Sequence, residues 1–170
     1  DCHIIGINLG AGTDGSEFDF DFLANVVETL EYSENFKPVL LIGGTDQERA
    51  MSDELNAHHG NRLISINMDI SAAPSVLCNL DFLISRPSRM TALADALDTR
   101  VLEITNHATA PLAFNEGSFH IIEANGPASE DALFVLGQEF EEILPMAIKN
   151  SENKVYARVK DDMGDFWTLI

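Results

Sequence analysis

Two loops in the sequence carry residue types that could bind an anionic ligand. The first, residues 10–15, reads Gly-Ala-Gly-Thr-Asp-Gly and has the GxGxxG spacing between a predicted strand and a predicted helix. Backbone amides in such a loop, together with the amino end of the following helix, can hold a diphosphate. The candidate binding residues of this loop are Gly10, Ala11, Gly12 and Thr13.

Acidic residues crowd the entrance to the same helix and work against a diphosphate there. Their carboxylates would repel its negative charge. A dinucleotide-binding domain also carries an acidic residue about 20 positions after its glycines, and Asp46 comes too late to match. A tight strand-to-helix turn explains the glycines without any ligand. The acidic residues in question are Asp14, Glu17, Asp19 and Asp21.

The second loop, residues 85–89, holds two of the ten basic residues of the chain. Arg86 and Arg89 lie at the start of a predicted helix that Ser88 can cap. Two guanidinium groups beside free helix amides suit a phosphate or a carboxylate. The alternative is that both arginines pair with surface carboxylates. On the first interpretation, Arg86, Ser88 and Arg89 are candidate binding residues.

A third loop follows the continuous apolar run at residues 39–42. Its two glycines allow a tight turn into the next helix, which Thr45 can cap and whose dipole Asp46 and Glu48 complement. These structural roles account for every residue of the loop without a ligand. Functionally, an acidic residue here could accept a hydrogen bond from a sugar or ribose hydroxyl, and this makes Gly44 and Glu48 candidates.

Apolar runs of strand length alternate with helical patterns, which favours βαβ units. We expect a three-layer, Rossmann-like α/β domain with a mainly parallel six-stranded sheet and helices on both faces. In the doubly wound order 3-2-1-4-5-6, ligands bind where the chain reverses, between the loops at 10–15 and 85–89. Strands are expected at 3–9, 38–42, 62–66, 81–85, 100–104 and 119–122, and helices at 18–30 (capped by Ser16), 46–58, 73–80, 88–97 and 129–148.

Residues 1–150 are expected to form this Rossmann-like domain, and residues 151–170 a C-terminal tail. The tail contains a possible extra strand at 154–159 and the only tryptophan, Trp167. We expect it to pack on the domain or on a neighbour.

Charge and composition exclude several classes of function. The chain has 28 acidic and 10 basic residues and a formal net charge of -18, so it repels nucleic acid and anionic membranes. The sequence contains no apolar run of the roughly 18 residues that a membrane span needs. Its two cysteines and five histidines lack metal-ligand spacing. We therefore expect a cytoplasmic protein without a nucleic-acid partner, a metal ion or a cofactor.

Catalytic residues are not assigned by the sequence. It contains no GxSxG motif for a serine hydrolase. His107 and Glu116, in the long loop after the fifth predicted strand, could reach the crevice, but ordinary loop polarity explains them equally well.

Three short sequence stretches occur in the same order as in a known protein family. They are GINLGA at 6–11, LIGG at 41–44 and ADALDTRV at 94–101. Over about residues 4–105, this order resembles the C-terminal, donor-binding half of family 9 glycosyltransferases, the lipopolysaccharide heptosyltransferases of the two-domain GT-B fold. The resemblance implies an ADP- or UDP-linked sugar as ligand, an N-terminal acceptor domain missing from this chain, and a role in lipopolysaccharide or other cell-surface polysaccharide synthesis.

The chain also departs from the family pattern at the donor site. After its first strand the family carries a basic stretch, and a lysine of that stretch helps to hold the donor diphosphate. Residues 13–19 of this chain contain no basic residue. The family's loop over the donor corresponds to residues 87–92, where only the hydroxyl of Ser88 keeps the chemistry of its counterpart. Because the family's catalytic base lies in the N-terminal half, this chain alone is expected to be inactive.

The leading hypothesis is therefore a nucleotide-sugar-binding domain of a heptosyltransferase-like enzyme, either still functional or with a degenerate donor site. A non-catalytic Rossmann-like interaction module, whose acidic surface meets a basic partner, is the alternative. An NAD(P)-type dinucleotide-binding domain ranks third.

Overall fold

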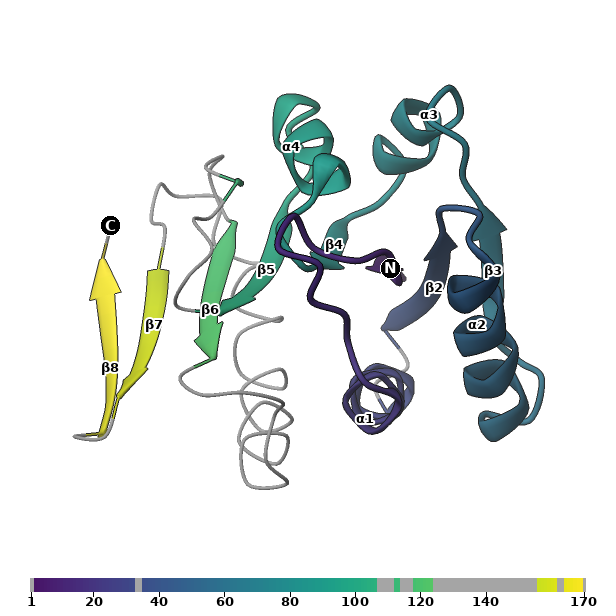
Figure 1. The fold of residues 1–170 in the computed structure, drawn as a ribbon, viewed down its shortest axis with the longest axis horizontal. Coiled ribbons are helices and arrows are strands. Elements are labelled where there is room, and N and C mark those ends of the chain that lie inside the picture. Colours follow the sequence, from purple (N-terminus) through teal and green to yellow (C-terminus); the bar gives the residue numbers. More distant parts are fainter. Residues whose placement is uncertain are drawn as a thin grey trace.

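The computed structural model describes residues 2–32, 35–106, 112–113, 118–123, 156–161 and 164–169. These residues form one eight-stranded sheet, in the order β3-β2-β1-β4-β5-β6-β7-β8 (Figure 1). The neighbouring strands from β3 across to β7 are parallel, and β8 runs antiparallel to β7. The strands are β1 (His3–Asn8), β2 (Phe36–Ile42), β3 (Ile64–Asn67), β4 (Phe82–Ser85), β5 (Val101–Asn106), β6 (Phe119–Glu123), β7 (Tyr156–Asp161) and β8 (Gly164–Leu169).

The expected order 3-2-1-4-5-6 is confirmed for the first six strands, but the expected total of six is too low. β7 overlaps the extra strand considered at 154–159, and β8 was not expected. Both strands mix charged and apolar residues, so their own sequences give a weak strand signal. β7 obtains backbone partners from the edge of β6, and β8 from β7. The division at residue 150 stays a prediction.

Four helices are described: α1 (Phe20–Tyr32), α2 (Asp46–His58), α3 (Ala73–Leu77) and α4 (Arg89–Ala96). Each lies where a helix was expected, and α3 and α4 are a few residues shorter than their predicted ranges. The helix predicted at 129–148 lies outside the described residues.

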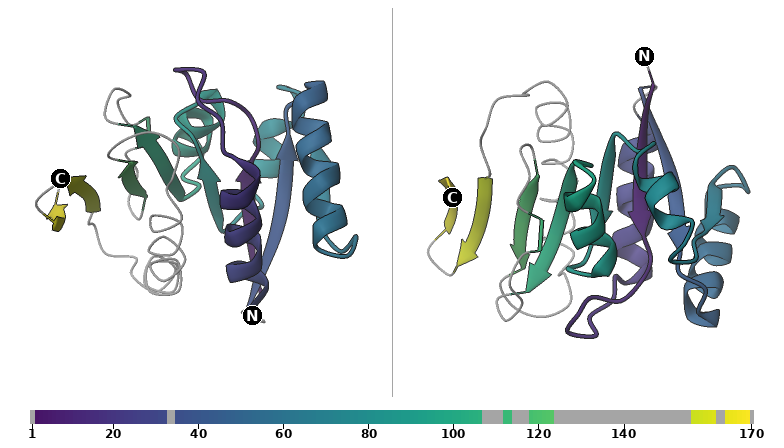
Figure 2. Two further views of the ribbon diagram at one scale, coloured as in Figure 1. Left: turned by 60° about the horizontal axis from the view of Figure 1, so that its bottom comes forward. Right: turned by 90° about the horizontal axis from the view of Figure 1, so that it is seen from above.

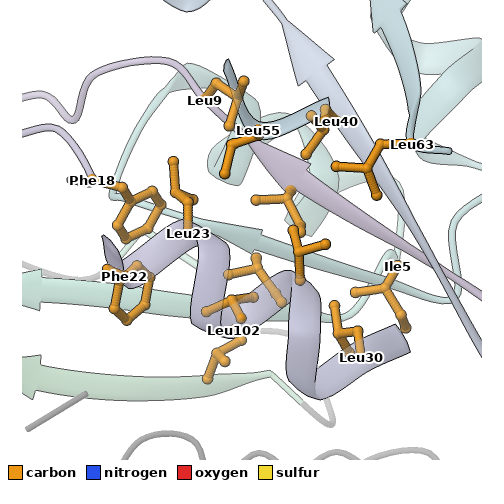
Figure 3. Packing of buried hydrophobic residues seen from close by; sticks show 14 of the residues in the cluster. Ile5, Leu9, Phe18, Phe22, Leu23, Leu30, Leu40, Leu55, Leu63 and Leu102 are labelled. Atoms are coloured by element: carbon orange, nitrogen blue, oxygen red, sulfur yellow. The ribbon is translucent and has the colours of Figure 1, made fainter. Parts of the chain in front are cut away.

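The helices cover both faces of the sheet, as expected for a three-layer fold (Figure 2). Side chains alternate along a strand, and β2 shows the consequence: Leu40 packs in the core beneath α1 and α2, whereas Leu41 packs on the other face, beneath α3 and α4. Figure 3 shows the first of these cores, where Leu30 of α1 lies beside Ile5 of β1 and Leu23 lies nearer to Phe18.

The start of α1 differs from the prediction. Ser16 does not cap the helix, because Asp19 accepts the hydrogen bond from the backbone N–H of Phe22 at 2.7 Å. Ser16 instead donates both its amide and its hydroxyl to the carboxylate of Asp14. The helix therefore begins only at Phe20, well after the glycine loop.

Candidate functional site

The first and second loops lie side by side at the carboxyl ends of β1 and β4. Those strands are direct neighbours in the sheet. The backbone N–H of Thr13 donates to the carbonyl of Pro87 at 2.7 Å, which ties the two loops together. This is the reversal point of the strand order, where ligands bind in sheets of this kind.

The backbone amides of the glycine loop are largely used inside the protein. The N–H of Gly10 donates to the side chain of Asn8 at 3.3 Å, that of Gly12 to the carbonyl of Ser16 at 2.7 Å, and that of Gly15 to the carbonyl of Gly12 at 2.9 Å. Because α1 also starts several residues later, the loop does not aim a helix N-terminus at a diphosphate. This geometry counts against an NAD(P)-type site.

Local packing explains two of these glycines. A Cβ atom on Gly12 would lie 3.2 Å from the Cβ of Arg86 and 2.8 Å from a carboxylate oxygen of Asp14. Gly15 has a φ of +78°, in the left-handed region that other residues rarely adopt. Both glycines serve the close approach and the turn of the loop.

Arg86 is buried rather than displayed to a ligand. It is 7% exposed, and its guanidinium lies over the ring of Phe18 at 4.6 Å from the ring centroid. The two terminal nitrogens donate to the backbone carbonyls of Ile104 at 3.3 Å and Glu17 at 3.5 Å. Arg86 therefore joins the segment after the first loop to β5.

Arg89 and Ser88 have different surroundings from Arg86. Arg89 is exposed at the first residue of α4, whereas Ser88 is buried and caps that helix. The hydroxyl of Ser88 accepts from the N–H of Thr91 at 3.4 Å, and the hydroxyl of Thr91 accepts from the N–H of Ser88 at 3.2 Å. Of the two arginines of this loop, Arg89 is the one that a dissolved anion can reach.

A buried polar cluster that the sequence analysis did not single out lies beneath the second loop. The amide nitrogen of Asn8 donates to the hydroxyl of Ser85 at 3.0 Å, which donates to the carbonyl of Arg86 at 2.7 Å. The hydroxyl of Thr91 donates to the same carbonyl at 2.9 Å. Asn8 and Ser85 end the apolar strands β1 and β4 with a polar residue, and this sequence signal could have identified them.

Glu48 lies between the third loop and the first. One carboxylate oxygen accepts the N–H of Gly43 and, at 3.1 Å, that of Gly44, whose φ of +106° requires glycine. The other oxygen lies 3.6 Å from the position that a Cβ of Gly10 would occupy. Glu48 thus stands beside the glycine loop, in reach of a ligand hydroxyl in the crevice.

Glu103 is a second carboxylate that the sequence analysis did not single out. It lies on β5, next to Ser85 in the register of the sheet, and is fully buried. One of its oxygens accepts the backbone N–H of Leu112 at 2.8 Å and that of Ala113 at 3.4 Å. Its charge therefore anchors the chain after β5 instead of facing a ligand.

A cavity of about 400 Å³ opens at the opposite, amino-terminal edge of the sheet, lined in part by His3, Asp81 and Thr99. These three side chains already have partners within the protein. The carboxylate of Asp81 accepts the N–H of Ile4 at 2.7 Å and contacts Nδ1 of His3 at 3.4 Å, and the hydroxyl of Thr99 donates to the carbonyl of Leu77.

Two further observations concern metal ligands and membrane spans among the described residues. Within the described ranges, no three His, Cys, Asp or Glu side chains are placed to hold a metal ion. None of the helices described is long and apolar enough to cross a bilayer. His107 and Glu116 lie outside the described residues.

The strand order and the paired loops define a Rossmann-like α/β domain whose strand order reverses between β1 and β4, where these loops meet. Neither a protein-family model nor a curated protein matches the sequence. Solved structures do match it in fold, and they include the E. coli heptosyltransferase WaaC with ADP, at a TM-score of 0.69 and 14% identity, covering 88% of this chain and 47% of that one.

Two other matches have similar values. The E. coli ADP-heptose lipopolysaccharide heptosyltransferase II has a TM-score of 0.65 and 15% identity, with 87% of this chain and 47% of that chain covered. A family 9 glycosyltransferase from Veillonella parvula has a TM-score of 0.65 and 11% identity, with the same coverage. The chain spans less than half the length of these proteins. The resemblance to heptosyltransferases is thereby confirmed at the level of the fold.

Proposed function

We propose that this chain is the donor half of a two-domain glycosyltransferase of heptosyltransferase type and that it binds a nucleotide sugar between residues 10–15 and 85–89. The observation that carries the proposal is the shared fold with heptosyltransferases solved with ADP and with ADP-2-deoxy-2-fluoro heptose. The acceptor and the catalytic base would come from a second α/β domain. The cellular role would be synthesis of lipopolysaccharide or another surface polysaccharide.

The proposed contacts follow from the side chains that remain available. Arg89 stands exposed at the amino end of α4, where a cation and helix amides together favour a phosphate. Glu48 offers a carboxylate oxygen beside Gly10 for a ribose or sugar hydroxyl. Ala11 and Thr13 are exposed on the glycine loop and would line the crevice. Arg86 would act indirectly, by holding the loop in position.

The charge distribution makes this a weak anion site. The segment around the glycine loop contains Asp14, Glu17 and Asp19 and no basic residue. A diphosphate bound beside this loop is therefore repelled by their carboxylates. Affinity should therefore depend on Arg89. Catalysis would need positive charge from elsewhere to stabilise a departing nucleotide diphosphate.

Calorimetric titration of the chain with ADP, with an ADP-linked sugar and with a UDP-linked sugar tests the proposal. Arg89→Ala should weaken binding about tenfold, because a charged hydrogen bond contributes roughly 1.5 kcal/mol. Arg62→Ala is the matched control, since the exposed Arg62 precedes β3 at the opposite edge of the sheet, where it pairs with Glu31 at 3.4 Å. No heat with any of the three ligands at millimolar concentration would refute donor binding.

A further inference from the structure

The edge of the sheet formed by β3 lacks most of the features that keep an exposed strand from pairing. In the described part of the chain, β3 ends the strand order, so one side of its backbone has no strand beside it. Natural proteins protect such edges with lysine, proline, a bulge or an inward-facing charge. The residues of β3 are Ile-Ser-Ile-Asn, and its short length is the only protection of this kind that it has.

Exposed apolar side chains lie on and next to this edge. Ile64 of β3 is 59% exposed, and Ile70, in the turn that follows, is 69% exposed. Ile66 packs against the core beneath α3, so Ile64, two residues earlier, projects from the same face of the strand. β3 lies at the edge of the sheet (Figure 1), so unpaired backbone groups and exposed apolar side chains occur together there.

The same region is neutral in a strongly acidic chain. Residues 56–80, which include β3 and α3, contain Arg62 and Asp69 as their only Asp, Glu, Lys or Arg side chains, whereas the whole chain has a net charge of -18. A basic partner would be attracted only weakly to this neutral surface and strongly to the acidic remainder of the chain. A second copy of this chain, itself highly acidic, meets the least repulsion here.

From these observations we propose that β3 is a self-association surface, on which two copies pair their β3 strands antiparallel about a twofold axis. Such an interface is isologous, so each copy contributes the same edge and the two sheets become continuous. Ile64 of one copy would pack against apolar side chains of the other. Ser52 of α2 hydrogen-bonds Ser65 of β3 at 2.7 Å, so the exposed carboxylates of the next two residues, Asp53 and Glu54, should oppose the contact electrostatically. This surface is separate from the proposed donor crevice.

The proposal is tested by light scattering after size exclusion, from micromolar to near-millimolar protein, at about 0.1 M and about 1 M salt. Wild type should move toward twice the monomer mass as concentration rises, and further at high salt, because screening shortens the Debye length from about 10 Å to about 3 Å. Association led by a basic surface would show the opposite salt dependence. A monomer under all conditions, or a dimer that salt dissociates, would overturn the proposal.

Ile64→Lys tests the location of the contact, because it places a charge on the edge at an exposed position that folding does not need. Tyr32→Lys is the control. Tyr32 is 86% exposed at the end of α1, a helix that packs on β2 and α2. Only Ile64→Lys should remain monomeric, with both variants keeping the wild-type circular dichroism spectrum. Equal association of the two variants would rule out this edge. Hydrogen exchange should also slow at β3 as protein concentration rises, and no change there would count equally against it.

Discussion

The two arginines of the second loop stand three residues apart in the sequence and meet very different environments. Arg86 is 7% exposed, stacked on Phe18 and bonded to two backbone carbonyls, while Arg89 is exposed at the start of α4. A buried charge is tolerated only when hydrogen bonds replace the lost water. The structure meets this condition for Arg86, which makes it a structural residue, and leaves Arg89 as the one suited to a ligand.

Replacement of each arginine by alanine should separate these roles. Arg86→Ala should lower the free energy of unfolding by about 2–4 kcal/mol, through lost charged hydrogen bonds and the cation–π contact. Arg89→Ala should change it by less than about 0.5 kcal/mol, as exposed substitutions usually do. Urea denaturation measures both values. Equal destabilisation by the two variants would contradict the separation.

Asp69 illustrates how single carboxylates contribute to stability in this chain. The pKa of its carboxyl is lowered from the usual value by the side-chain hydrogen bond from Ser71 and by the backbone N–H groups of Ala72 and Ser71. A lowered folded-state pKa means that the stabilisation is fully present above the unfolded value, about 3.9. It is lost as pH falls below that value toward the folded-state pKa.

Asp69→Asn, which cannot ionise, should therefore be less stable than wild type near neutral pH and should approach it below about pH 3.9. Urea midpoints measured from neutral to strongly acidic pH give the difference at each value. Asp53→Asn is the control, because Asp53 is exposed in the middle of α2, away from the positive end of the helix dipole. A wild-type advantage that persists unchanged into acid would disprove the linkage.

At the scale of elements, the loop before α1 shows how one segment can satisfy a sequence motif without serving its usual purpose. The spacing of residues 10–15 matches a phosphate loop, yet most of its amides are bonded internally and the helix starts at Phe20. Helix starts are set by the residue whose side chain reaches the free N–H groups. Here that residue is Asp19, three positions after the serine that the pattern favours.

The two candidate caps can be compared directly. Asp19→Ala should cost about 1 kcal/mol of stability, because it leaves the N–H of Phe22 without its side-chain acceptor. Ser16→Ala should cost less, since Asp14 can still accept the backbone amide of residue 16. Thermal unfolding followed by circular dichroism ranks the two variants. A larger loss from Ser16→Ala would reverse the assignment of the cap.

At the scale of the whole molecule, the net charge of -18 sets the conditions under which the fold is stable. Part of the acidity has a structural use, because the carboxylates of Asp19, Glu48 and Glu103 each accept backbone N–H groups. The remaining charges repel one another across the surface. Such self-repulsion disfavours the compact state and is weakened by screening.

Raising the salt concentration from about 0.05 M to about 1 M should therefore raise the melting temperature by several degrees. Calorimetry of dilute protein, where self-association is absent, measures this shift. Sodium chloride is preferable to sulfate, because sulfate stabilises most proteins by exclusion from their surfaces. An unchanged melting temperature would show that the acidic residues are too far apart to interact.

Local patterns allowed the sequence to determine the positions of β1 to β6 and α1 to α4 and the place where the first and second loops meet. Periodicity, glycine turns and the handedness of βαβ units act over short stretches, so they can be read without a structure. The motif order also led to the heptosyltransferase-like fold. β7 and β8 were predicted less well, because β8 pairs only with β7, and β7 joins the sheet through β6, which lies far from it in the sequence.

Only the tertiary structure decided which side chains reach the crevice. Arg86 and Arg89 have identical chemistry, and their roles differ because one is packed against Phe18 and β5. The hydrogen bond between Asn8 and Ser85 joins residues 77 positions apart, a separation that no local pattern can reveal. Burial and hydrogen-bond partners depend on which distant segments pack together, and so they determine function here more than the motif does.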